Sequence, residues 1–389
     1  MHKITEEIGK TVQEFIEIRR FLHQNPEVGF EEVQTTELIA QKLSKWGYEV
    51  DRAISKTGVV GTLQVGDGEK KLGLRSDIDA LPIEELGDRE WKSKVTGKMH
   101  GCGHDGHTAT LLCAAKYLAQ TKNFSGTLHL IFQPAEELLY GSKTMIEGGL
   151  FAKHPCDAVF GLHNMPLLPK GEFYFRKGAM MASADTLEIQ VNGVGGHGAV
   201  PEKTVDPALV ACHIGVALQS IVARNISPFE QAVVTFGCIQ AGNVANVIDN
   251  KAMMKLSVRA LNSEVRQLIL KRISDIATMQ AQSFGATAEI THVNGCPVLV
   301  NEQEMTDFAI DVAQSLFGKD KVHGDAAPAM GSEDFAFLLE AVKKGTFVFL
   351  GAGDKDCFPV HHPKYDFDDD LIVIGASYWA GLTENFLQK

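Results

Sequence analysis

Several features that mark other protein classes are missing from this sequence of 389 residues. No continuous apolar run approaches the roughly 18 residues of a membrane-spanning helix, and the N-terminus lacks the apolar stretch of a signal peptide. An excess of positive charge is also missing, because Asp and Glu outnumber Lys and Arg by 49 to 37, which gives a net charge of -12. We therefore expect neither a membrane nor a nucleic acid as the main partner. A small anionic substrate is compatible with this net charge, because a few cations near the site can outweigh negative charge on a distant part of the surface.

Cysteines are few, with seven scattered along the chain, and their number is odd. That arrangement favours reduced thiols in a cytoplasmic protein over a framework of disulfides. Internal repeats and low-complexity tracts are also lacking, while apolar residues make up 44% and charged residues 22% of the sequence. Such a composition is typical of a soluble globular protein, and the length suggests two domains.

Helix and strand patterns alternate along the first half of the chain. The spacing of apolar residues predicts helices over residues 4–22, 31–46 and 107–118. Short apolar runs predict strands at Gly58–Val65, Leu72–Arg75, Gly126–Phe132 and Ala158–Leu162. Strands that alternate with helices indicate an α/β fold with a partly parallel sheet.

The pattern changes near Ala182. Strands are then expected at residues 186–191, 233–238, 251–260 and 286–293, with helices over residues 207–225 and 263–284. After about Gly295 the α/β pattern returns, with helices at 302–317 and 333–341 and a strand at 346–350. We therefore predict a discontinuous α/β catalytic domain, residues 1–182 and 293–389, with an inserted α+β sandwich of residues 183–292.

The densest group of reactive side chains lies in the segment MHGCGHDGH, residues 99–107. It places His100, Cys102, His104, Asp105 and His107 among three glycines, which permit the tight turns that aim neighbouring side chains at one point. Thiolate, imidazole and carboxylate are the usual ligands of zinc-like metals. A polar helix start with incidental histidines is the alternative, but so many ligand types in one short segment favour a metal-binding loop. The spacing is not that of a structural zinc finger.

A pair of glutamates, Glu136 and Glu137, follows the predicted strand at 126–132. Adjacent carboxylates at a strand end can divide their work, because one can bind a metal while the other takes a proton from water. A solvated helix start is an equally common reason for such a pair. The metal-binding loop upstream makes the functional interpretation the better one.

Histidines occur in two further places. His163 directly follows the predicted strand at 158–162, and His361 and His362 lie near the C-terminus. A single histidine after an apolar strand is more often a core or loop residue. Several of them at the carboxyl ends of strands, where α/β sheets place their active sites, favour one shared site.

Together these motifs resemble the M20 metallopeptidase family, in the branch that contains hippurate hydrolases, aminoacylases and plant auxin-conjugate hydrolases. The resemblance extends over nearly the whole chain. Its further motifs are RRFLHQNPEVGFE at residues 19–31, RSDIDALP at 75–82, GGHGA at 195–199 and GSEDF at 331–335. These motifs are specific for the branch, but they say little about which substrate is used.

The resemblance implies two divalent metal ions per subunit. The implied ligands are Cys102, His104, Glu137, His163 and His361. Cys102 takes a bridging position that is aspartate in other branches, and a thiolate favours zinc over manganese, cobalt or nickel. Asp77 matches an aspartate that orients a ligand histidine. His362 stands where relatives tend to have Asn or Ser, so the choice between His361 and His362 stays open.

The resemblance also assigns roles outside the ligand set. Glu136 is the implied general base. His197, in the inserted segment, is expected to reach across a dimer interface to the substrate carbonyl of the neighbouring protomer. Asn246 and Arg259 are expected to hold the substrate and its carboxylate, for which an arginine fork is well shaped. A homodimer through the inserted domain is therefore expected, with a tetramer as the alternative.

The activity predicted on these grounds is metal-dependent hydrolysis of the amide bond of small N-acyl-L-amino acids such as hippurate. A dipeptidase or an N-acetyl-amino-acid deacetylase of the same family is the nearest alternative. A metal-binding protein without catalysis is another, and Glu136 argues against it because storage needs ligands but no adjacent base. The acyl group and the amino acid stay open.

Overall fold

The computed structural model describes residues 3–353 and 357–388. The chain forms two compact units, the first comprising Met1–Gly178, Val300–Ala327 and Asp334–Lys389 and the second Ala179–Leu299 with Pro328–Glu333. The predicted domain boundaries, after residues 182 and 292, both fall inside the second unit. One of them cuts strand β13 (Thr287–Cys296), whose last residues still pair with β8 (Ser183–Asn192). The segment 328–333 belongs there because its backbone bonds to Ala182.

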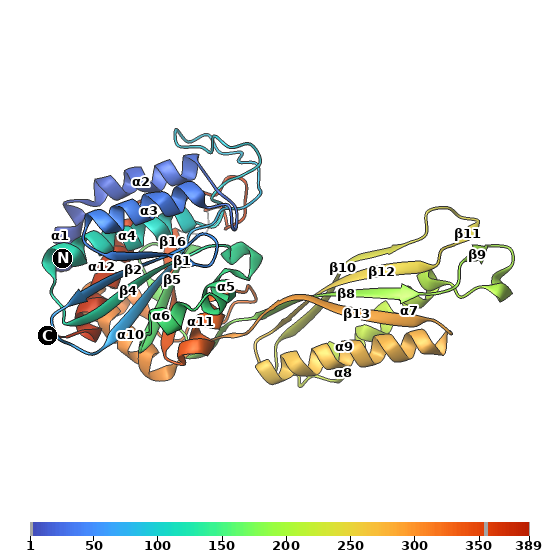
Figure 1. The fold of residues 1–389 in the computed structure, drawn as a ribbon. Helices are drawn as coiled ribbons and strands as arrows, with labels where there is room; N and C mark the ends of the chain where they lie inside the picture. The colour runs from blue at the N-terminus through green and yellow to red at the C-terminus, as the bar shows by residue number, and fades with distance from the viewer. Residues whose placement is uncertain (1–2, 354–356, 389) are drawn as a thin grey trace. The chain divides into compact units, whose positions relative to one another are not determined.

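The first unit contains an eight-stranded sheet in the order β1-β2-β4-β3-β5-β16-β6-β15. Figure 1 labels β1, β2, β4, β5 and β16 of this sheet. Its strands are β1 (Glu49–Ile54), β2 (Gly58–Val65), β3 (Lys71–Asp77), β4 (Gly126–Gln133), β5 (Ala158–Pro169), β6 (Phe173–Tyr174), β15 (Val322–His323) and β16 (Gly345–Gly353). Strands β4, β3, β5 and β16 run parallel at the centre, as the alternating pattern predicts. Strand β1 was not predicted from the sequence, because three of its six residues are charged.

Helices surround this sheet. They are α1 (Lys3–Gly9), α2 (Val12–Gln24), α3 (Val33–Lys45), α4 (His104–Thr121), α5 (Gly141–Glu147), α6 (Leu150–Lys153), α10 (Gln303–Phe317), α11 (Phe335–Val342) and α12 (Leu371–Phe386). The single helix predicted over residues 4–22 is two helices that break after Gly9, a poor helix former. Helix α12 was not predicted, since it is buried nearly all round and so shows no clear apolar face.

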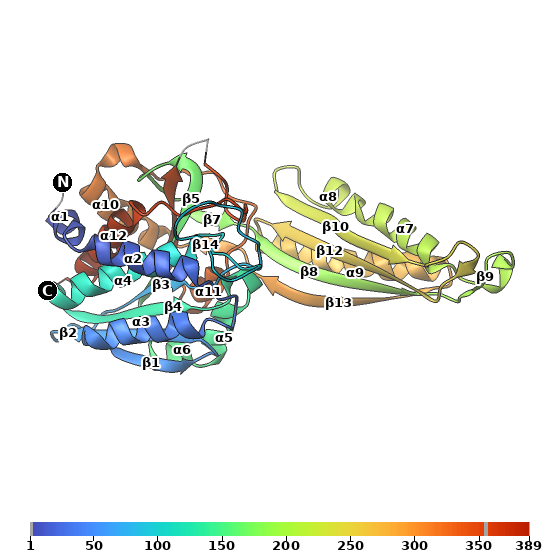
Figure 2. The same ribbon diagram turned by 90° about the horizontal axis from the view of Figure 1, so that it is seen from above.

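Both faces of the sheet are covered. Phe160 of β5 contacts Phe308 of α10 and Phe386 of α12, whereas a Cβ on the next residue, Gly161, would meet Phe335 of α11. Because successive residues of a strand point to opposite faces, α10 and α12 cover one face and α11 the other. Helix α4 packs beside α12 (Figure 2).

The carboxyl ends of the central strands meet at one edge of the sheet. Asp77 of β3 lies opposite Gln133 of β4, and Arg75 lies opposite Gly161 of β5. This register brings the end of β3, the loop after β4 and His163 of β5 together. It is the arrangement from which α/β proteins build their sites.

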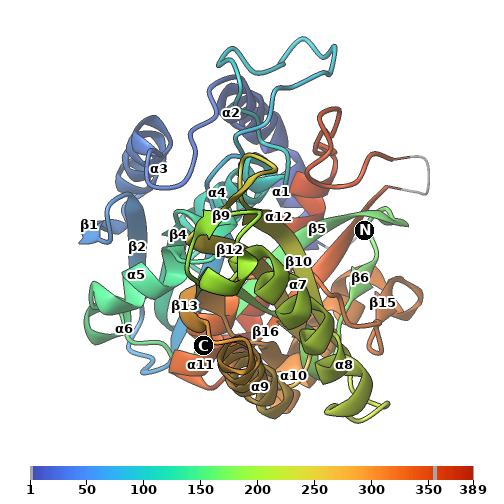
Figure 3. The same ribbon diagram turned by 90° about the vertical axis from the view of Figure 1, so that its right-hand side faces the viewer.

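The second unit contains a four-stranded antiparallel sheet in the order β10-β12-β8-β13. Further elements of this unit are β9 (Gly196–His197), α7 (Pro207–Leu218), α8 (Ser220–Arg224), β10 (Ala232–Ala241), β11 (Val247–Ile248), β12 (Lys251–Ala260) and α9 (Ser263–Ser283). Strand β7 (Gly178–Met181), at the start of the unit, pairs with β14 (Leu299–Asn301). Helices α7 and α9 pack together on one face of the sheet (Figures 1 and 3). Two helices on one face of a four-stranded antiparallel sheet match the α+β sandwich predicted from the sequence.

Helices α7 and α8 together form a stretch, Pro207–Arg224, that is long and apolar enough to cross a membrane by length and composition. In the sequence this stretch is not a continuous apolar run, because polar residues such as His213 and Gln219 interrupt it. Val210 and Ile214 are buried, while Leu209 and Val216 are exposed. A core helix in a water-soluble domain passes the same test, so the stretch is weak support for a membrane span.

Candidate active site

The predicted metal-binding loop is held against the end of β5. Gly103, which precedes α4, has a φ of +95°, and a Cβ there would lie 2.3 Å from Asn164 Oδ1 and 2.7 Å from Tyr365 Oη. Glycine is therefore required by both the conformation and the space. This close approach leaves Cys102 Sγ 3.4 Å from His163 Nε2.

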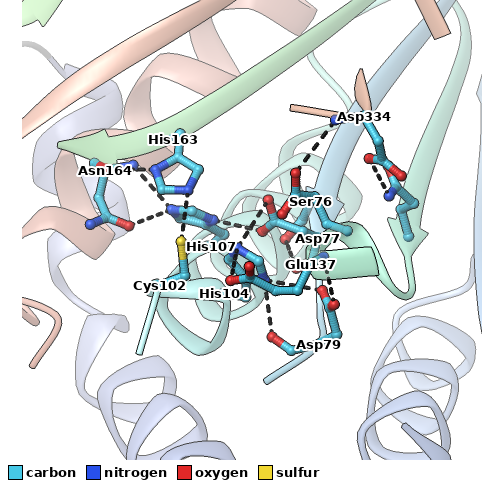
Figure 4. Close-up of polar contacts among 12 residues, drawn as sticks. Ser76, Asp77, Asp79, Cys102, His104, His107, Glu137, His163, Asn164 and Asp334 are labelled. Carbon is cyan, nitrogen blue, oxygen red and sulfur yellow. Dashed lines mark hydrogen bonds and ion pairs between the residues drawn. The ribbon is translucent and has the colours of Figure 1, made fainter. Parts of the chain in front are cut away.

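Side chains from β3, α4, β5, the loop after β4 and the loop before α4 converge at this edge of the sheet (Figure 4). His361, from the loop after β16, joins them. Their ligand atoms lie within 4.8 Å of one another in overlapping groups, which are Cys102–Glu137–His361, His104–Glu136–Glu137 and Asp77–His104–His107–His163. All five predicted ligands and the predicted base Glu136 thus belong to the first unit and share one centre.

The ligand histidines are oriented so that one nitrogen of each faces the centre. His163 Nδ1 donates to the carbonyl of Asn164 at 2.6 Å, which leaves the Nε2 lone pair directed at Cys102. His104 Nδ1 contacts the carbonyl of Asp79 at 2.9 Å. Among the described residues, the buried His104 Nε2 has no hydrogen-bond partner. A buried nitrogen without a partner fits a metal ligand whose other nitrogen is fixed by the protein.

Asp79 makes the contact that was predicted for Asp77. Its Oδ1 lies 3.1 Å from His104 Nδ1, and its Oδ2 accepts the backbone N–H of Glu137 at 3.0 Å. Asp77 Oδ1 instead contacts His107 Nδ1 at 2.6 Å, and its Oδ2 lies 3.7 Å from His104 Nε2. The two aspartates are two residues apart in one motif, so the sequence offered no means to choose between them. Asp79 is therefore a site residue that sequence reasoning missed.

Two other histidines of the motifs, His107 and His362, have their ring nitrogens or ring faces in contact with other residues. Both ring nitrogens of His107 are occupied. Its Nδ1 contacts Asp77, and its Nε2 lies 3.0 Å from the backbone nitrogen of Asn164. His362 stacks on Phe358 at 4.4 Å, and its Nδ1 accepts the backbone N–H of Lys364 at 3.1 Å. His361 Nε2, in contrast, lies 3.3 Å from Glu137 Oε1. The geometry therefore favours His361 over His362 as the ligand.

The electrostatics of the centre favour a bound cation. Burial raises the pKa of the Cys102 thiol, and the charges of Glu137, Glu136 and Asp77 raise it further. Burial opposes protonation of His104, but Asp77, Asp79 and Glu137 together raise its pKa to about 10. Burial lowers the pKa of His163 and keeps its ring neutral, which is the form that binds metal. Cys102 in these negative surroundings is not an activated nucleophile, whereas a divalent cation would hold it as a thiolate.

A buried ion-pair network supports the start of α4. Arg19 Nε donates to Asp105 Oδ2 at 2.9 Å, and His23 Nδ1 contacts the same oxygen at 2.8 Å. Both residues come from the RRFLH motif, to which the sequence analysis assigned no role. Because Asp105 follows His104 directly, the network fixes the helix that carries this predicted ligand.

The three remaining predicted residues lie in the second unit. β9 pairs with β11, so that the N–H of Gly198 donates to the carbonyl of Asn246 at 2.9 Å. The N–H of Ala199 donates to His197 Nδ1 at 3.0 Å, which leaves the proton on Nε2 of this exposed ring. Arg259 lies near the opposite end of β12, where it donates to Ser332 Oγ at 2.5 Å. Whether these residues contact substrate stays a prediction.

The sequence and fold have clear relatives. The model of peptidase family M20/M25/M40 matches residues 73–385. The hippurate hydrolase of Campylobacter jejuni is 48% identical over 375 residues, which cover 96% of this chain and 97% of that protein. The N-acetylcysteine deacetylase of Bacillus subtilis is 37% identical, with coverage of 94% and 95%. A solved structure, the YXEP protein of Bacillus subtilis, a dinuclear metal binding peptidase from the M20 family, matches with a TM-score of 0.83, 34% identity and coverage of 97% and 98%. The chain described here belongs to peptidase family M20/M25/M40.

Proposed function

We propose that this protein hydrolyses the amide bond of N-acyl-L-amino acids and releases a carboxylic acid and a free amino acid. The observation that carries the proposal is a carboxylate base, Glu136, placed beside a set of Cys, His and Glu ligands in which Cys102 and His104 are buried. Relatives named for the hydrolysis of hippurate and the deacetylation of N-acetylcysteine support the same bond type. Hippurate is benzoylglycine, so we infer that hippurate-like compounds are the preferred substrates and that N-acetyl-amino acids are the alternative.

We infer that two divalent metal ions are required, with zinc favoured by the thiolate ligand. Cys102, His104, Glu137, His163 and His361 would hold them. When bound, such ions polarise the amide carbonyl and make water easier to deprotonate. The buried His104 Nε2 and the negative surroundings of Cys102 support this assignment.

Glu136 performs the proton transfers in this proposal. This residue is 6% exposed and begins a three-residue 3₁₀ turn shortly after β4. The carboxylate takes a proton from the attacking water as the new C–O bond forms, and it returns this proton to the nitrogen as the C–N bond breaks. Both transfers need a fixed geometry, and the bond from the backbone N–H of Glu137 to Asp79 Oδ2 holds this turn in place.

The activity is tested with a panel of benzoyl-, acetyl-, indoleacetyl- and aminoacyl-amino acids. We expect benzoylglycine to be cleaved with the highest kcat/KM among them, and dialysis against a chelator to remove most of the activity. Added Zn²⁺ or Mn²⁺ should restore it. Failure to cleave any member of the panel, or full activity in protein shown to be metal-free, contradicts the proposal. A preference for acetyl groups supports the deacetylase alternative instead.

We further propose that the protein is a homodimer through its second unit. Exposed apolar side chains lie on α7 and β10, among them Leu209, Val216 and Ile239. Within this unit, His197 lies on β9, which pairs with β11 just before the start of β12, whereas Arg259 lies near the end of β12. From the start of β12 to Arg259 the strand extends over about eight residues, or roughly 26 Å. One small substrate cannot reach both side chains of a single copy, so their joint action requires a second copy. We propose that His197 Nε2–H serves as an oxyanion donor to the site of the partner subunit.

Mixing two weakened variants tests this arrangement. His197→Ala is expected to lower kcat by about 100-fold, the effect of losing one oxyanion donor, with a smaller change in KM. Mixed dimers of His197→Ala and Glu136→Gln contain one site with both residues intact, so part of the activity should return. If no activity returns after subunit exchange has been verified, His197 does not act across a dimer interface.

A further inference from the structure

Beside the proposed metal centre, the buried guanidinium of Arg75 joins two buried carboxylates. Its Nη1 donates to Asp77 Oδ2 at 2.8 Å, and its Nη2 donates to Asp334 Oδ1 at 3.2 Å. Its Nε donates to Gln133 Oε1 at 2.8 Å. Asp77 faces the ligand histidines, as described above, whereas Asp334 faces the loop after β4 (Figure 4). A buried carboxylate is costly unless it is paired and hydrogen-bonded, and Asp334 is both.

Asp334 bonds to both ends of the loop that carries the base. Before the loop, Gln133 Nε2 donates to Asp334 Oδ1 at 2.7 Å. After it, the N–H of Ser142 donates to Asp334 Oδ2 at 2.9 Å, and Ser142 Oγ donates to the carbonyl of Asp334 at 2.6 Å. The backbone N–H of Asp334 also makes a long contact of 3.4 Å with Glu136 Oε1.

The loop between these two anchors has a conformation that its own sequence does not favour. Ala135 and Leu139, on either side of the 3₁₀ turn, both have a φ of +52°. Residues with a Cβ adopt this region only when their surroundings impose it. Gly141 adds a further restriction, because a Cβ there would lie 1.6 Å from the carbonyl oxygen of Pro134. Bonds within the loop, such as that from the N–H of Gly141 to the carbonyl of Ala135, hold part of this shape, and contacts with residues outside the loop hold the rest.

We propose that Asp334 is a positioning residue for the general base: it clamps the loop 134–141 at both ends and so fixes Glu136 beside the metal ligands. The carboxylate of Asp334 lies near those of Glu136 and Glu333, but in this proposal it is not a ligand, because both of its oxygens already accept bonds from Arg75, Gln133 and Ser142. The inference rests on the proposed function for its kinetic consequences. Its structural consequence, a loop ordered by Asp334, does not depend on the substrate.

The test uses Asp334→Asn in the full-length, metal-loaded protein. The amide keeps the size of the side chain but removes the charge that pairs with Arg75 and turns an accepting oxygen into a donor. We expect kcat to fall by about 10- to 100-fold, KM to change by less than about 3-fold and metal content to stay as in the unmodified protein. Amide hydrogen exchange should become faster in residues 135–142. Asp185→Asn is the matched control, since Asp185 is equally buried and pairs with Arg266 in the second unit. It should lower the melting temperature without changing exchange in the loop.

A double-mutant cycle with Glu136→Gln tests whether Asp334 acts through the base. If it does, Asp334→Asn should slow the Glu136→Gln protein by less than about 3-fold. Multiplicative losses, a loss of bound metal or unchanged exchange in the loop overturn the proposal. Ser142→Ala, which removes one anchor bond and keeps the charge, should also speed exchange in the loop, and it decides the matter if Asp334→Asn does not fold. Inactivity of the unmodified protein on every substrate refutes the proposed function, while hydrogen exchange still decides the role of Asp334.

Discussion

Glu136→Gln is expected to lower kcat by about 1,000-fold or more while the protein keeps its metal. A positioned general base contributes roughly 10²- to 10⁴-fold, and here one carboxylate performs both proton transfers. Glutamine has nearly the same size as glutamate and leaves Cys102, His104 and Glu137 untouched. The rate should be measured with the best substrate of the panel, and the metal content by elemental analysis of the same sample.

The neighbouring glutamate provides the matched control. Glu137→Gln should lose metal as well as activity. The ligand atoms of Glu137 lie within 4.8 Å of those of Cys102 and His361 in one group, and of that of His104 in another. If Glu136→Gln lost metal and Glu137→Gln kept it, the assignment of base and ligand would be reversed. Equal metal loss in both variants would make Glu136 a ligand as well.

Cys102→Ala is expected to remove metal from the centre and to lower kcat/KM by about 1,000-fold. Even the outer hydrogen-bond partners of metal ligands typically matter by about 10- to 100-fold, and Cys102 belongs to the innermost set. Cys102→Asp should retain part of both metal and activity, because a carboxylate can also bridge two ions. Metal content and kcat/KM measured on both variants check this prediction.

The competing explanation is that Cys102 forms an acyl-enzyme with a histidine as its base. That mechanism needs a thiol with a lowered pKa, whereas burial and three nearby carboxylates raise the pKa of Cys102. A covalent acyl adduct on Cys102, detected by mass spectrometry during turnover, would establish the nucleophilic role. Activity that survives in Cys102→Asp speaks for the ligand role, since aspartate at this position has no thiol to acylate.

Much of the fold could be predicted from the sequence because apolar spacing reports directly on burial. The strand predicted at Lys251–Ala260 has the observed bounds of β12, since its residues alternate between buried and partly exposed. Apolar spacing gave the wrong result at three elements, each for its own reason. Helix α12 is apolar nearly all round, β1 is half charged, and the break after Gly9 divides what reads as one amphipathic helix.

The sequence by itself determined the chemistry of the centre. Cys102 and His104 stand in one short segment and Glu136 and Glu137 are adjacent after β4, and the reaction needs those residue types and few others. Which partner each one has was decided only by the tertiary structure, because hydrogen bonds depend on strand register and on the direction of each side chain. The register of β3 against β4 and β5 placed Asp79, not Asp77, on the outer nitrogen of His104. The fold also brought Asp334, about 200 residues away in the chain, against the loop of Glu136.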